Sequence, residues 1–155
     1  MRNHPVTSVL VAIVIAAAIV GGVGVAVANF VSNSVNPQDA NVSVDVWRSA
    51  YLRSIGWSAL ATSVGVAFWL LGAHSGKGLD TKSGQWYTLW FVTIFVSALL
   101  AWLVPPALRE GPLQPMLRNA GLALVGYWVA TFFMAPDHYR FTPLLARAVW
   151  AQRGA

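Results

Sequence analysis

The feature that most constrains this chain is an apolar segment from Val6 to Ala28, which contains no charged residue over 23 positions. An α-helix rises about 1.5 Å per residue, so the segment would extend roughly 34 Å as a helix. The hydrocarbon core of a bilayer is about 30 Å thick. A segment this long and apolar predicts a helix that crosses a membrane, at about residues 6–31.

The same segment also has features of a secretory signal peptide. Arg2 precedes it, and the small residues Ala26 and Ala28 are spaced as in a cleavage site. The apolar region of a signal peptide usually has about 7–15 residues, which is shorter than this one. We therefore expect an uncleaved span that remains part of the protein.

Three further apolar segments predict three more spans, at about residues 55–73, 86–104 and 117–135. Pro105, the first of two consecutive prolines, would end the third span, because proline lacks an amide donor and clashes with the preceding turn. The fourth span is the least apolar. Its full length includes Arg118, whose charge would have to extend to the membrane surface.

Two helical segments are expected at the membrane surface. Asp45 is a suitable N-cap for a lead-in to the second span, which has an apolar side flanked by arginines. Thr142 and Pro143 are a suitable start for a short helix at about residues 143–151. The sequence thus predicts an all-α, polytopic membrane protein forming a single membrane domain (residues 1–155). This domain would contain four transmembrane helices, an interfacial lead-in to the second helix and a short amphipathic C-terminal helix.

The composition agrees with this fold class. Charged residues make up 10% of the chain, against roughly 25% in an average soluble domain. The 57% of hydrophobic residues exclude a disordered chain, and the absence of cysteine excludes a disulfide framework. The net charge of +5 comes from scattered arginines and lysines, so no nucleic-acid partner is expected.

Aromatic and basic residues near the span ends are typical of membrane-interface anchors, since indole and phenol rings are amphipathic and long cationic side chains reach the headgroups. The expected anchors are Trp47, Arg48, Tyr51, Arg53, Trp57, Trp86, Trp90, Arg147 and Trp150.

Four spans would place both termini on the same side of the membrane. That side would carry six basic residues and the other side four, which favours cytoplasmic termini in a bacterial inner membrane. The six are Arg2, Lys77, Lys82, Arg140, Arg147 and Arg153, and the four are Arg48, Arg53, Arg109 and Arg118.

Residues that could carry chemistry are sparse. No Asp, Glu, Lys, Arg or His lies in the interior of a predicted span, whereas proton-coupled transporters and ion pumps require such groups. The loop 72–78 has the wrong glycine spacing for a phosphate-binding loop. We therefore expect no catalytic residue, no cofactor and no metal. An enzyme acting on lipid would have to use a rim formed by His74, Asp80, Asp137 and His138.

Small residues recur at every fourth position of the first span. Ala18, Gly22 and Ala26 form one row, and Gly24 and Ala28 belong to a second. Small residues at this spacing allow two helix backbones to approach closely in a membrane. The sequence predicts a helix-packing interface here, and the partner helices could belong to the same chain or to another subunit.

These observations favour a non-enzymatic structural or accessory subunit of a multi-subunit inner-membrane assembly. Secretion or conjugation machinery and energy-transducing complexes are plausible hosts, and the expected partners are the lipid bilayer and other membrane subunits, in a homo- or hetero-oligomer. The alternative is a small oligomeric channel or transporter with a polar lining of Thr62, Ser63, Thr93, Ser97 and Thr131.

Overall fold

The computed structural model describes residues 4–34, 44–75, 88, 91–96, 98–99 and 113–136. These residues form α1 (Pro5–Ala17), a π-helical segment η1 (Ala18–Val23), α2 (Gly24–Ser34), α3 (Val44–Ser75) and α5 (Leu113–Met134), with a short helical stretch at 91–96. No strand occurs within the described ranges, so the predicted all-α class is confirmed for them.

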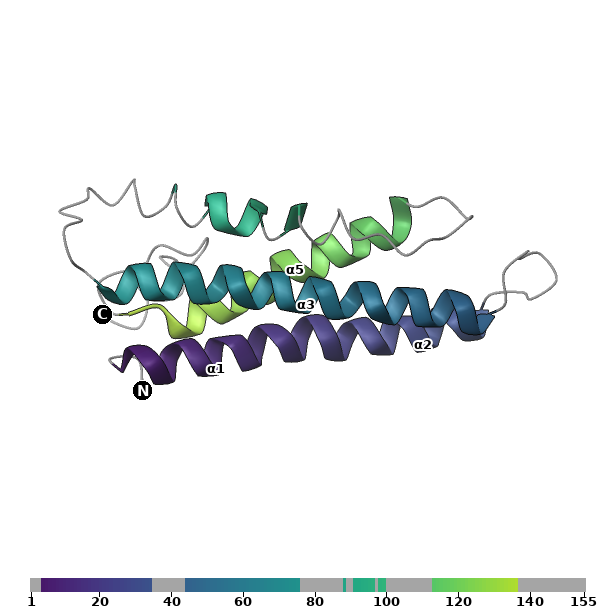
Figure 1. Cartoon of the computed structure of the whole chain (residues 1–155), viewed down its shortest axis with the longest axis horizontal. Helices are drawn as coiled ribbons and strands as arrows, with labels where there is room; N and C mark the ends of the chain where they lie inside the picture. The colour runs from purple at the N-terminus through teal and green to yellow at the C-terminus, as the bar shows by residue number, and fades with distance from the viewer. Residues whose placement is uncertain are drawn as a thin grey trace, which may run out of the picture.

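The helices lie side by side as a bundle (Figure 1). α1, η1 and α2 follow one another as a single long rod, which runs alongside α3 over most of its length. α5 packs against both α1 and α3, and residues 91–96 lie on the side of α3 away from the rod. The space between α1, α3 and α5 therefore holds the core.

Two helices are long and apolar enough to cross a membrane, by length and composition: Pro5–Phe30 and Tyr51–Ser75. The first agrees with the predicted span at 6–31, and the second begins one turn earlier than the predicted 55–73. α5 covers the predicted fourth span as a helix, but it does not meet the same criterion. The predicted third span is described only in part, so the four-span topology is not confirmed.

α3 joins the predicted lead-in and the second span into one helix of 32 residues. Asp45 lies in its first turn, where the negative charge interacts favourably with the helix dipole. No proline interrupts the helix from residue 44 to residue 75. The predicted surface helix at 143–151 lies outside the described residues.

The first rod changes its hydrogen-bonding pattern at η1, six residues that include Gly21 and Gly22. A π-turn is wider than an α-turn and accommodates an additional residue. On both sides of it the buried positions are spaced by four, a row formed by Ser8, Ala12, Ala16, Val20, Gly24 and Ala28. In a regular helix of about 3.6 residues per turn such a row would drift around the axis. The wider turn reduces that drift and keeps the row facing the bundle.

The core consists of two clusters. The larger one lies between α1, α3 and α5 and contains Trp69, Leu70 and Tyr127, each 0% exposed. The smaller one lies where α2 meets α3 and contains Ala28, Tyr51 and Ile55. Small residues on the first rod leave room for the large side chains of α3 and α5.

The outward faces of both membrane-length helices are apolar. Of an apolar 18-residue stretch in each helix, only 28% is buried inside the bundle in Pro5–Phe30 and 33% in Tyr51–Ser75. The helices expose large aliphatic and aromatic side chains, including Val6, Leu10, Val14, Phe30, Leu60, Val64, Phe68 and Leu71. Core helices of a soluble protein would be mostly buried, so these faces require an apolar environment or a partner.

Candidate functional site: packing faces, a polar seam and an apolar groove

The two predicted rows of small residues have different environments. Gly24 and Ala28 are buried against α3, and a Cβ atom added to Gly24 would lie 2.8 Å from Cγ2 of Ile55. Ala18, Gly22 and Ala26 are exposed, and a Cβ atom added to Gly22 would meet nothing within 4 Å. One row therefore packs within the chain, while the other remains available on the surface of the bundle.

A further close approach joins the first rod to α5. A Cβ atom added to Gly126 would lie 2.9 Å from Cγ2 of Val20 and 3.4 Å from the backbone oxygen of Ala16. Sequence reasoning did not select this contact. The sequence feature that points to this contact is the four-residue spacing of Ser8, Ala12 and Ala16, which continues the row of Gly24 and Ala28 toward the N-terminus. Val20 lies in the same row but is larger, so it interrupts the pattern of small residues.

A seam of buried polar side chains runs along α3. The hydroxyls of Ser54, Ser58 and Thr62 donate hydrogen bonds to backbone oxygens of their own helix, at 2.8, 2.9 and 2.7 Å. Asn119 of α5 donates from Nδ2 to Oγ of Ser54 at 2.9 Å. Its Oδ1 atom is buried without a hydrogen-bond partner. The Asn119–Ser54 contact ties the beginning of α5 to α3.

A second polar contact joins α5 to the helical stretch at 91–96. The hydroxyls of Thr93 and Tyr127 form a hydrogen bond, and both side chains are buried. Thr131 donates to the backbone oxygen of Tyr127 at 2.8 Å. The predicted pore-lining residues Thr62, Thr93 and Thr131 thus make hydrogen bonds inside the bundle, while Ser97 lies outside the described residues. A polar-lined channel stays a prediction from the sequence.

The Thr93–Tyr127 pair yields a testable expectation. Tyr127→Phe and Thr93→Val should each destabilise the protein, because each variant removes one hydroxyl of the pair and leaves the other buried without this hydrogen bond. The double variant should lose less than the sum, with a coupling free energy on the order of 1 kcal/mol. Unfolding in detergent, followed by tryptophan fluorescence, measures this cycle. Strictly additive losses would show that the two hydroxyls do not interact.

The predicted anchors on α3 differ in their surroundings. Arg53 and Trp57 are exposed, and Arg48 donates from Nη2 to Oδ1 of Asn29 on α2 at 2.8 Å. Tyr51, by contrast, is 0% exposed, because the small Ala28 opposite it leaves space for the ring. The remaining predicted anchors are not described at the level of side chains: Trp47, Trp86, Trp90, Arg147 and Trp150.

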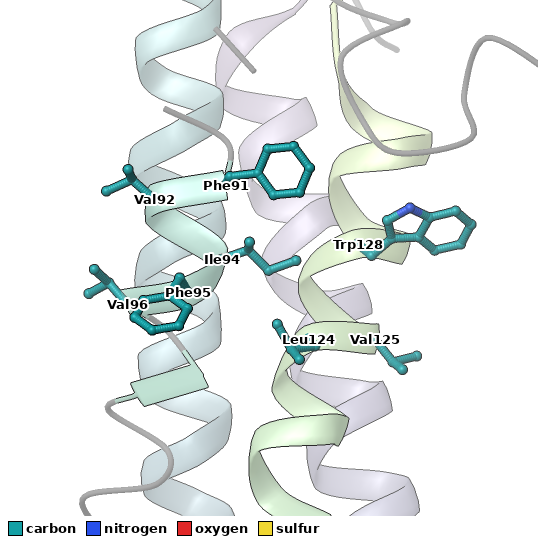
Figure 2. A pocket seen from close by; sticks show the side chains of 8 residues that line it. All are labelled: Phe91, Val92, Ile94, Phe95, Val96, Leu124, Val125 and Trp128. Carbon is teal, nitrogen blue, oxygen red and sulfur yellow. The ribbon is translucent and has the colours of Figure 1, made fainter. Parts of the chain in front are cut away.

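One groove among the described residues is apolar. It lies between the helical stretch at 91–96 and α5 and has a volume of about 680 Å³. Figure 2 shows Phe91 and Ile94 directed toward α5, opposite Leu124 and Trp128. The described residues that line it are all aliphatic or aromatic, so their surface is suited to contact with hydrocarbon.

The histidine rim suggested by the sequence is described only at one position. His74 lies in the last turn of α3, and its Nε2 atom is buried without a hydrogen-bond partner. Asp80, Asp137 and His138 lie outside the described residues. Among the residues that the structure describes, no three His, Cys, Asp or Glu side chains are grouped to hold a metal ion.

Comparison with protein-family models, with curated proteins and with solved structures found no match to this chain.

Proposed function

We propose that this protein is a non-enzymatic structural or accessory subunit of a multi-subunit assembly in a bacterial inner membrane. The observation that carries this proposal is the exposed row of Ala18, Gly22 and Ala26 on a helix of membrane-crossing length. In a bilayer, where lipid chains are as apolar as leucine, close backbone packing drives helix association. This row would receive a helix of another subunit.

The membrane location is part of the proposal. It is supported by two helices of sufficient length whose outward faces are apolar. The buried Ala28 supports retention of the first span, because the proposed cleavage site lies within a packed helix. We further propose that α5 and the segment 86–104 complete a four-span topology with both termini in the cytoplasm.

The position of Arg118 is compatible with α5 as a span. This side chain is exposed near the beginning of α5 and lies beside Tyr51, the first residue of the span in α3. An arginine at that depth can extend to the headgroup region. α5 would thus cross the membrane with its charged residue at the surface.

Two glycine variants separate assembly from folding. Gly22→Leu should leave the bundle intact, because a Cβ atom at this exposed position meets nothing within 4 Å. It should lower the association constant of the assembly on the order of tenfold, which corresponds to about 1.4 kcal/mol. Gly24→Leu should instead lower the stability of the subunit itself, because its side chain would collide with Ile55. Native mass spectrometry after mild detergent extraction measures assembly, and thermal unfolding measures stability.

Ser75→Leu provides the matched control for Gly22→Leu, since Ser75 is also exposed but lies at the end of α3. It should leave assembly unchanged. A wild-type protein that remains a monomer with all cellular partners present would contradict the proposal. Equal losses of assembly in Gly22→Leu and Ser75→Leu would contradict the role of the small-residue row.

A further inference from the structure

The buried hydroxyls of α3 can only accept hydrogen bonds from a neighbouring helix. Each hydroxyl has a single proton, and Ser54, Ser58 and Thr62 donate theirs to backbone oxygens of α3 itself. Their oxygen atoms keep lone pairs but have no proton left to donate. Asn119 of α5 matches this chemistry with one half of its amide, since its Nδ2 atom donates to Oγ of Ser54 at 2.9 Å.

The other half of the Asn119 amide is not matched. Its Oδ1 atom is buried without a hydrogen-bond partner, and the residue as a whole is 1% exposed. An amide oxygen needs a donor, and Ser54 has none to offer. A buried acceptor without a partner costs at least as much free energy as an average hydrogen bond between membrane helices gains. Net stability therefore does not explain the contact between Asn119 and Ser54.

The apolar side chains of α5 do not define which side of this helix should face α3. The helix exposes Leu124 and Val125 and buries Ala123. Lipid chains are as apolar as these residues, so a bilayer accepts either side. Glycine also occurs on both sides, because Gly126 is packed against the first rod whereas a Cβ atom at Gly121 would meet nothing within 4 Å. A polar contact can make the choice that apolar side chains and glycines leave open.

We propose that the Asn119–Ser54 contact determines which side of α5 faces α3, and that it does so without adding to the stability of the bundle. Turning Asn119 away from Ser54 would remove the hydrogen bond that its amide makes in the native orientation. A single buried asparagine selects one arrangement of helices in coiled coils in the same way, at a cost in stability. The Thr93–Tyr127 pair joins α5 to the stretch 91–96 and leaves this role to Asn119. The inference uses the proposed membrane location and is independent of the proposed assembly role.

The stability part of the proposal is tested with three variants. Ser54→Ala should lower the ratio of folded to unfolded protein on the order of tenfold, because it leaves Nδ2 of Asn119 buried without its acceptor. Ser54→Ala/Asn119→Leu should restore the wild-type ratio or exceed it, because both polar partners are replaced together. Ser58→Ala is the matched control, since it removes a buried hydroxyl of α3 that Asn119 does not contact. Its effect on the ratio, measured by chemical unfolding in detergent, should be smaller than that of Ser54→Ala.

The orientation part is tested by the distance between two spin labels. The chain has no cysteine, so labels attach only at introduced cysteines. Leu71 of α3 and Val125 of α5 are 54% and 53% exposed and can be replaced to carry them. Pulsed electron paramagnetic resonance in nanodiscs should give one distance for the wild-type background and the same distance for Ser58→Ala. Ser54→Ala/Asn119→Leu should give a second distance, because the label on α5 moves around the helix axis.

Two results would overturn the proposal. A double variant as unstable as Ser54→Ala, or one that does not fold, would mean that the contact contributes net stability. A single, unchanged distance in the double variant would mean that α5 is oriented without Asn119. Both results leave the membrane location intact, because the labelled chain is already in nanodiscs. A wild type that does not enter nanodiscs would overturn the membrane location together with this inference, whereas the assembly role is tested separately by the glycine variants.

Discussion

Gly126→Leu is expected to separate α1 from α5 and to reduce the free energy of unfolding by about 3 kcal/mol, the upper end of the usual cost of overpacking. A Cβ atom at this position would lie 2.9 Å from Cγ2 of Val20. Valine is stiff about χ1, so this methyl group cannot rotate away freely. The next contact, at 3.4 Å, is with a backbone oxygen of Ala16, which can move only if the helix moves.

Gly121→Leu is the matched control, because it lies on the same helix and a Cβ atom there would meet nothing within 4 Å. Thermal unfolding and size-exclusion chromatography in detergent compare the two variants. Gly121→Leu should behave as the wild type does, while Gly126→Leu should melt earlier or aggregate. Equal stability of the two variants would show that α1 and α5 do not approach each other at Gly126.

Trp69→Ala is expected to have a comparably large effect. Trp69 is 0% exposed and belongs to the cluster that joins α1, α3 and α5. In a membrane, burial against protein gains little transfer free energy, but truncation still leaves a cavity and removes dispersion contacts. We expect a loss of about 3 kcal/mol, the lower end of the range for tryptophan truncations in protein cores.

Trp57→Ala tests whether this loss depends on burial. Trp57 lies on the same helix but is 54% exposed. Chemical unfolding in detergent should show a much smaller change for Trp57→Ala than for Trp69→Ala. A loss of the same size in both variants would contradict the placement of Trp69 in the core.

The positions of the first two membrane-length helices could be predicted because length and apolar composition alone define them. α5 was harder to interpret, since Arg118 and Asn119 interrupt its apolar sequence. In the structure, Asn119 has a hydrogen-bond partner, Ser54, on α3, at a separation of 65 residues. Such long-range pairing has no signature in a single sequence.

The small residues were also predictable as a class, but their orientation was not. The row with Gly22 and the row with Gly24 have the same spacing, so the sequence does not show which row faces α3. Their orientation depends on the π-helical segment, which only the adjacent glycines Gly21 and Gly22 suggest. Tyr51 is a similar case, because its sequence position predicts a surface anchor whereas its ring is buried beside Ala28. The space for this ring becomes visible only when α2 and α3 are placed together.

The π-helical segment Ala18–Val23 has a consequence for chain length. A π-turn is equivalent to one residue inserted into an α-helix. The first rod therefore contains one residue more than a regular α-helix that would present Gly24 and Ala28 to α3 in the same way. Evolution could delete that residue and leave this contact in place, whereas a deletion elsewhere in the rod would rotate its two halves relative to each other. The segment is thus the position at which the first helix can change its length without changing its partners.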